Sequence, residues 1–203
     1  MRFFRCALLG ALISTALRSL EATTVVPPKF AELVSGADYV VRARVKAIRY
    51  EAKERPGKPP LIYTKVTLEV IETIAGQPPA EPELTVLGGR WGDHELRVEG
   101  LPQFEVGQEE VMFVHGNGRV FYPLYAAMHG RYPIRKDKEG REFITRTNGV
   151  QLDDVAEVAA PLTQGPAAEL QQRFKKSSDA LTPAKFIEQV RAQRSTGGRV
   201  VEK

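Results

Sequence analysis

The sequence predicts a mainly β fold, either a sandwich or a barrel, with a short helix before it and a longer helix after it. Three observations predict this class. Between residues 37 and 145, many short segments carry apolar side chains at alternating positions, the period of a half-buried strand. Glycine, proline and asparagine separate these segments and indicate turns. No internal repeat and no alternation of strands with helices is present, which argues against a parallel βαβ sheet.

The first element is expected to be a short helix over residues 29–36. Phe30, Leu33 and Val34 are spaced so that they share one helical face, and Gly36 then ends the helix.

Strands and turns alternate through the middle of the chain. The proline-rich segment Lys53–Pro60 is expected to be a loop between the first two strands. Gly116-Asn117-Gly118 is expected to be a hairpin turn, because asparagine and glycine adopt positive φ at low cost. The strands are predicted over residues 37–49, 63–74, 84–87, 94–98, 110–115, 120–126, 131–134 and 143–145.

The chain divides near residue 150, where the alternation weakens. We predict a β-barrel domain over residues 23–149, a linker or wrap over 150–181, and a C-terminal helix and tail over 182–203. Thr182-Pro183 favours a helix start, with a capping hydroxyl and a proline in the first turn. The apolar face of this helix either docks on the β domain or binds a partner.

The N-terminus has the pattern of a cleavable export signal. The first five residues include two arginines, Arg2 and Arg5, and an uncharged run of 12 residues, Cys6–Leu17, follows them. That run is shorter than the roughly 20 residues that a membrane-spanning helix needs. Cleavage is expected at Ala16 or Ala22, so residues 1–22 would be a signal peptide. The mature chain would then be periplasmic or extracellular, without a membrane span; the alternative is a buried N-terminal helix.

Composition limits the classes of function. The 203 residues are 42% hydrophobic and 27% charged, which fits a soluble globular protein and excludes a disordered or multispanning one. Without residues 1–22 the chain has 26 basic and 24 acidic residues, a charge too mild to favour nucleic-acid binding. Its single cysteine, Cys6, lies in the predicted signal, which excludes a disulfide scaffold and a cysteine-rich zinc module. We expect no metal and no cofactor.

Catalytic motifs are absent from the sequence, which contains no phosphate-binding loop, no G-x-S-x-G turn and no H-E-x-x-H pair. We therefore predict that the chain is not an enzyme. Asp93-His94-Glu95 contains suitable side chains for a metal or for acid–base chemistry. Neighbours on a strand point to opposite faces, so a solvated loop or strand edge is the preferred interpretation.

The candidate binding residues lie around the only tryptophan of the chain. Glycines on both sides of Arg90-Trp91 predict a sharp turn or bulge, in which Trp91 is either an exposed anchor for a partner or a plug in the core. Arg90, Trp91, Asp93 and His94 are the predicted binding residues. Basic side chains elsewhere are expected to be solvated charge: Arg131, Arg135, Lys136, Lys175 and Lys176.

Parts of the chain resemble the netrin-like domain of tissue inhibitors of metalloproteinases. Residues 37–45 (ADYVVRARV) resemble its first strand, residues 63–76 its next strand and turn, and residues 106–114 a later strand. Residues 28–146 also resemble exported bacterial proteins that share the Pro-x-Phe-x-x-Gly segment found at 102–107. The resemblance implies an OB-like closed five-stranded barrel with flanking helices. It does not carry the inhibitory chemistry over, because the family's N-terminal cysteine is missing from the mature chain.

Two functions remain as hypotheses. The first is an exported, non-catalytic barrel that binds a protein partner, such as an extracytoplasmic protease or an envelope component. The second is a barrel that binds an oligosaccharide or a nucleic acid through its strand face and the segments Lys53–Pro60 and Gly88–Asp93. A hydrolase is a third hypothesis, because the loops of an unfamiliar fold can hold a site.

Overall fold

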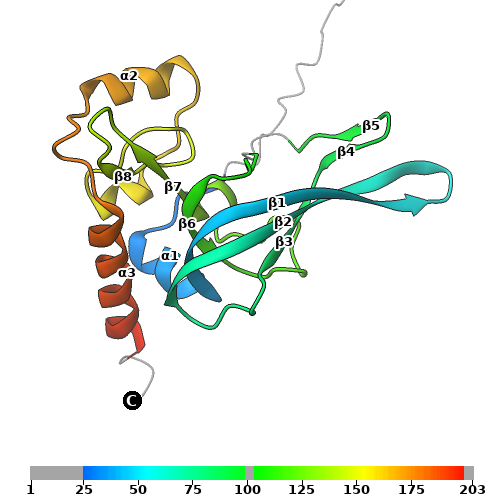
Figure 1. The fold of residues 1–203 in the computed structure, drawn as a ribbon, viewed down its shortest axis with the longest axis horizontal. Coiled ribbons are helices and arrows are strands. Elements are labelled where there is room, and N and C mark those ends of the chain that lie inside the picture. Colours follow the sequence, from blue (N-terminus) through cyan, green and yellow to red (C-terminus); the bar gives the residue numbers. More distant parts are fainter. Residues whose placement is uncertain (1–24, 99–102, 199–203) are drawn as a thin grey trace, which may run out of the picture.

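The computed structural model describes residues 25–98 and 103–198 and is mainly β, with 38% strand and 24% helix (Figure 1). Six antiparallel strands form one sheet in the order β3-β2-β1-β6-β7-β8, and β4 and β5 form a separate hairpin. In chain order the elements are α1 (Phe30–Gly36), β1 (Tyr39–Arg55), β2 (Lys58–Ala75), β3 (Glu83–Leu87), β4 (Gly89–Trp91), β5 (His94–Leu96), β6 (Glu109–Val114), the 3-10 helix η1 (Ala127–Gly130), β7 (Arg131–Lys136), β8 (Glu142–Ile144), the 3-10 helix η2 (Val155–Ala159), α2 (Pro166–Phe174) and α3 (Pro183–Gly198). The predicted export signal lies outside the described residues.

The expected closed OB-like barrel is wrong, because the edge strands β3 and β8 do not pair with each other. Instead, each edge is covered by a loop of the same chain. The Asn117 side chain accepts a hydrogen bond from the Thr85 amide (3.2 Å) and donates one to the Glu83 carbonyl (2.7 Å). At the other edge, β8 exchanges backbone hydrogen bonds with Leu152 and Leu181.

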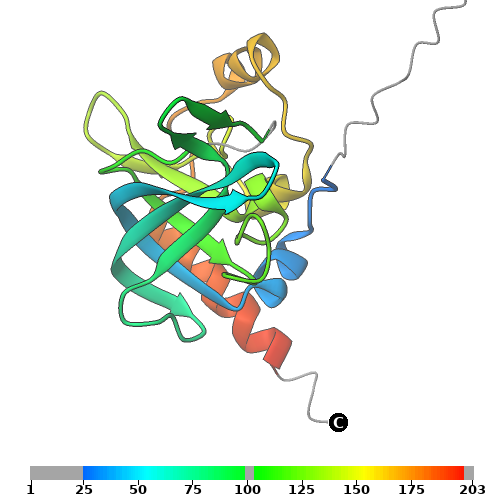
Figure 2. The ribbon, with the colours of Figure 1, turned by 90° about the vertical axis from the view of Figure 1, so that its right-hand side faces the viewer.

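The sheet packs a hydrophobic core against each of its faces, and its two edge strands are covered by loops rather than paired with each other. Alternation along β6 shows this arrangement: Val111 and Phe113 belong to one core, and Met112 and Val114 belong to the other. We call the first the helix-side core, since α1 and α3 pack there, and the second the hollow-side core, which the curved sheet encloses. Figure 2 shows the sheet curving on one side, with α3 (red) lying against the other.

The predicted C-terminal helix is confirmed as α3, and it docks on the sheet. The Thr182 hydroxyl accepts a hydrogen bond from the Lys185 amide (3.3 Å), which satisfies a free donor of the first turn. Phe186, Ile187 and Val190 are buried in the helix-side core, as their spacing predicts. The segment before α3 adds Val158 and other side chains to the same core.

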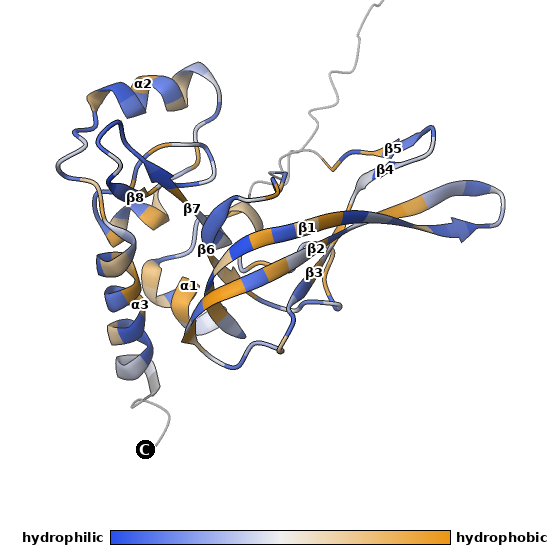
Figure 3. Cartoon of the chain, in the orientation of Figure 1, coloured by the Kyte–Doolittle hydropathy of each residue, from blue (hydrophilic) through white to orange (hydrophobic). Residues whose placement is uncertain are grey.

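β1 and β2 form a long hairpin whose outer half projects from the body of the molecule (Figure 1). We call this half, residues 46–61, the arm. The loop expected over Lys53–Pro60 is wrong, because both strands continue through it to a turn with Gly57 at φ +69°. Two prolines fit into β2 here because they lie at an irregularity in the β1–β2 pairing, between Lys53↔Leu61 and Arg55↔Lys58, and because β3 does not extend to them. Along both strands Figure 3 shows alternating apolar and polar bands.

A second expected strand, over residues 120–126, is also wrong. This segment is irregular and meets the sheet through one isolated bridge between Leu124 and Val114. It ends at Ala126 and Ala127, which have positive φ values of 49° and 52° that a strand does not allow. The turn predicted at residues 116–118 is present, and the chain that leaves it covers the edge of β3 rather than forming a hairpin.

Candidate functional site

The candidate site is a groove on the hollow side of the arm, and a β-bulge in β1 creates its wall. In the pairing of β1 with β2, Val45 lies opposite Leu68 and Ala47 opposite Thr67, so Lys46 is an extra residue. One extra residue reverses the alternation of side chains beyond it. Ile48 and Tyr50 therefore lie on the same face as Val45, although simple alternation places Ile48 on the opposite, basic face.

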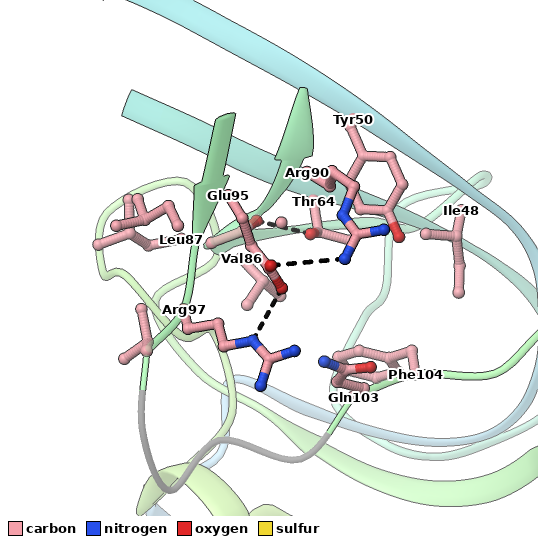
Figure 4. Close-up of a pocket in the computed structure, with 14 residues that line it drawn as sticks. Ile48, Tyr50, Thr64, Val86, Leu87, Arg90, Glu95, Arg97, Gln103 and Phe104 are labelled. Atoms are coloured by element: carbon pink, nitrogen blue, oxygen red, sulfur yellow. Dashed lines mark hydrogen bonds and ion pairs between the residues drawn. The ribbon is translucent and has the colours of Figure 1, made fainter. Parts of the chain in front are cut away.

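The β4–β5 hairpin leans across this face and completes the groove. Gly89 allows the close approach: a Cβ at this position would lie 2.7 Å from the Tyr50 ring and 2.8 Å from the Thr64 hydroxyl, and its φ of +134° also favours glycine. The cavity has a volume of about 840 Å³, and its walls are about equally polar and apolar (Figure 4). Its lining includes Ile48, Tyr50, Thr64, Val86, Leu87, Arg90, Glu95, Leu96, Arg97, Val98, Gln103 and Phe104.

Charge in the groove is concentrated around Glu95. Arg97 donates a hydrogen bond to its carboxylate at 2.8 Å, and Arg90 lies 3.4 Å from its other oxygen, so the two guanidinium groups approach from two sides (Figure 4). The hydrogen bond from Arg97, with the positive charges of both arginines, lowers the pKa of Glu95 below its ordinary value. Glu95 is thus ionised near neutral pH. Two cations share one anion, so the lining residues carry an excess of one positive charge.

A buried ion pair supports the floor of the groove. Glu110 and Arg131 are 0% and 2% exposed, and Arg131 Nε donates to the Glu110 carboxylate at 2.7 Å. The guanidinium lies 3.8 Å from the ring centroid of Phe104 and donates to the carbonyl of Gln103 at 3.3 Å. Burial alone would lower the pKa of Arg131, but the hydrogen bonds and charge of Glu110 outweigh it and raise the pKa. Burial also raises the pKa of the adjacent Tyr122 to about 12, so its hydroxyl stays neutral.

The four predicted binding residues all lie in the β4–β5 hairpin, but only Arg90 lines the groove. Trp91 is 47% exposed, which excludes the core-plug alternative. It pairs across the hairpin with His94, and Asp93 lies in the exposed turn between them. Asp93, His94 and Glu95 do not form a cluster. Within residues 25–98 and 103–198, no group of three acidic, histidine or cysteine side chains could hold a metal ion.

Sequence reasoning missed several residues of the site. The face on which Tyr50 and Ile48 lie could not be predicted, because the bulge at Lys46 reverses the alternation and nothing in the local sequence indicates it. Glu95 and Arg97 could have been found as a charged pair two residues apart on a predicted strand. The expectation that Arg131 is solvated charge is wrong, because this arginine is buried with Glu110. Lys175 is likewise largely covered, in ion pairs that include Asp153 at 2.9 Å and Glu157.

No helix in the described part of the chain is both long and apolar enough to cross a membrane. Comparisons with protein-family models, with curated proteins and with solved structures find no match for this chain. The resemblance to the netrin-like domain thus remains a prediction.

Proposed function

We propose that the chain is an exported, non-catalytic module that binds a protein partner through the groove and the β4–β5 hairpin. The observation that carries the proposal is the combination of an open cavity of about 840 Å³, lined by apolar and polar side chains in about equal parts, with half-exposed aromatic side chains, Tyr50 and Trp91, on the elements around it. Exposed aromatic residues beside a concave apolar surface are typical anchors of protein interfaces.

The charges of the groove define what a partner side chain would meet. A side chain that enters it lies against both apolar and polar groups and reaches Arg90 and Arg97, which share a single carboxylate. An acidic or amide group at the end of an apolar stem fits this arrangement best, because it would supply the second acceptor. An extracytoplasmic protein, either an envelope component or a secreted protease, is the class of partner that agrees with the predicted export signal.

The charge state of Glu95 supports a binding role over acid catalysis. A general acid needs a pKa near the working pH, and the arginines move the pKa of Glu95 in the opposite direction. Among the described lining residues Glu95 is the only carboxylate, and none is a histidine, cysteine or lysine.

Quantitative capture of a partner tests the proposal. Tagged chain starting at Thr23 is immobilised and exposed to extracytoplasmic extract of the native host, with Trp91→Ala and Ile71→Ala compared with wild type. Ile71 is a matched control: it is 44% exposed on β2, seven residues from Thr64 and outside the groove lining. We expect Trp91→Ala to reduce the captured partner at least tenfold and Ile71→Ala to leave it unchanged. Equal capture by all three chains would remove the β4–β5 hairpin from the binding surface.

Binding of an oligosaccharide or a nucleic acid is the second candidate, and the two arginines beside Tyr50 and Phe104 favour it. Of the segments first considered, Gly88–Asp93 borders the groove and Lys53–Pro60 forms the end of the arm. The result that would select this candidate is retention on polysaccharide or single-stranded DNA columns. That retention should fall as the salt concentration rises, and it should be weaker still for Arg90→Gln.

A further inference from the structure

The outer half of β1 has a free backbone edge. Strand β6 pairs with β1 over residues 39–44 only, and the last backbone bonds on this side join Val45 to Gly107 and Gln108. Beyond Val45, in the described part of the chain, no strand and no backbone hydrogen bond occupies this side of β1. An uncovered edge of this kind is a template for a further strand.

The two edge strands of the same sheet, β3 and β8, are covered. The loop around Asn117 bonds to the backbone of β3, and Phe121 accepts a hydrogen bond from the Leu87 amide (2.8 Å). Residues 152 and 181 cover β8. At the arm, β2 carries Pro59 and Pro60, which have no amide hydrogen to offer. The free edge of β1, in contrast, contains no proline.

The pairing of the arm shows which backbone groups this edge presents. Ile62 directs its carbonyl away from β1, because it accepts a hydrogen bond from the Gly88 amide at 2.8 Å. Its partner across the hairpin, Ala52, must then direct its own amide and carbonyl away from β2. Tyr50 and Ile48 lie two and four residues before Ala52 in the regular pairing, so they also direct their amides and carbonyls away from β2. Between the register shifts at Lys46 and after Lys53, pairing is regular over seven residues, and Tyr50 is the middle one.

The charges on this segment select both the occupant and its register. We propose that a second copy of this chain pairs with the free edge in an antiparallel, two-fold symmetric arrangement centred on Tyr50. In that register Tyr50 lies opposite Tyr50 of the other copy, and Ile48 lies opposite Ala52. All of these residues direct their hydrogen-bonding groups outward, so each pair forms the closely bonded type of antiparallel pair. The inference goes beyond the proposed function and does not depend on it.

Neighbouring registers are disfavoured by charge. Centring on Tyr50 places Arg49 of each copy opposite Glu51 of the other, on the face away from the groove. Centring one residue earlier would place Arg49 opposite Arg49, and centring one residue later would place Glu51 opposite Glu51. The segment RYE (49–51) thus specifies a single two-fold pairing. Because seven residues form a small contact, the dimer is expected to be reversible and dependent on concentration.

Cysteine cross-linking of the full chain in a Cys6→Ser background tests the register. The proposal places the two Tyr50 Cα atoms about 5.5 Å apart, within the range of a disulfide. Tyr50→Cys should therefore form a covalent dimer under mild oxidation, whereas Arg49→Cys, Glu51→Cys and the equally exposed control Ile71→Cys should not. Mixing Arg49→Cys with Glu51→Cys should give the mixed dimer. Failure of Tyr50→Cys to cross-link, or cross-linking of Arg49→Cys or Glu51→Cys alone, would overturn the proposal.

Sedimentation equilibrium gives an independent test on the unmodified sequence. We expect the average mass to rise from one chain towards two chains through the micromolar concentration range. Ala52→Pro removes an outward amide without touching the β1–β2 ladder, so it should reduce association at least tenfold while the circular dichroism spectrum is retained. A wild-type chain that stays at the mass of one chain throughout would refute the proposal, as would a folded Ala52→Pro chain that associates as well as wild type.

Discussion

The buried pair of Glu110 and Arg131 gives the sharpest test of the energetics beneath the groove. In Glu110→Gln the side chain keeps its size but loses its charge, which leaves a guanidinium that is 2% exposed without its anionic partner. Removing one member of a buried pair costs about 3–5 kcal/mol, because the remaining charge stays desolvated. The cation–π contact of Arg131 with Phe104 remains and is worth about 2 kcal/mol when shielded from water. We therefore expect a loss near the lower end, about 3 kcal/mol of unfolding free energy.

Urea denaturation measures this loss. With an m-value of about 2 kcal/mol per molar, 3 kcal/mol lowers the midpoint by about 1.5 M with the slope unchanged. The double variant Glu110→Leu/Arg131→Met removes both charges and should lie within about 1 kcal/mol of wild type. Glu95→Gln, in an exposed pair, is the control and should leave the denaturation midpoint close to that of wild type. A Glu110→Gln loss below about 1 kcal/mol, or a double variant as unstable as Glu110→Gln, would refute the reasoning.

Two further predictions concern pH and the hairpin turns. Burial, assisted by the charge of Arg146, lowers the pKa of His129 to about 4. An unfolded histidine has a pKa near 6.5, so the unfolded state binds a proton at a higher pH than the folded state does. The free energy of unfolding should therefore drop by up to about 3 kcal/mol as the pH falls from 7 to 4. His129→Gln should flatten that part of the pH profile, and an unchanged slope would contradict the assignment. Gly76 and Gly57 have nearly equal φ values, 71° and 69°, but a Cβ at Gly76 would lie 2.4 Å from the Asp38 carbonyl, whereas nothing lies within 4 Å at Gly57. Thermal denaturation should show Gly57→Ala costing about 1 kcal/mol and Gly76→Ala at least about 3 kcal/mol; equal losses would contradict the steric argument.

The sequence predicted those elements whose local signals agree with the tertiary structure. Thr182-Pro183 marks the start of α3 because capping is decided within one turn of helix. β3 was found because its apolar side chains are buried by the same alternation that the sequence shows, and β6 because it is a continuous apolar run buried on both faces. The end of the arm was missed because proline normally excludes a strand, and Pro59 and Pro60 are acceptable only because they lie at a pairing irregularity with no β3 beside them.

The closed barrel failed for a reason that alternation cannot reveal. Short strands with alternating side chains fit a barrel and an open sheet equally well, and the difference lies in whether the two edge strands pair with each other. Here Asn117 bonds to β3, and Leu152 and Leu181 bond to β8, so each edge is taken by a loop that alternation does not predict. At the site, Trp91 and Arg90 were found from the glycines on both sides of the only tryptophan. Tyr50 required the bulge at Lys46, and the burial of Arg131 required knowing that Glu110 lies next to it on the adjacent strand.

The two cores impose different degrees of constraint along a single strand. In the first part of β1, from Tyr39 to Val45, almost every side chain is buried against one core or the other, so nearly every substitution changes a packed volume. Past Lys46 the same strand is covered on one face at most, and alternate positions contact only solvent or a charged neighbour. A chain built in this way can diversify the surface it presents on the arm by mutation while the half that determines the fold stays fixed, which is how one scaffold could acquire new specificities without losing stability.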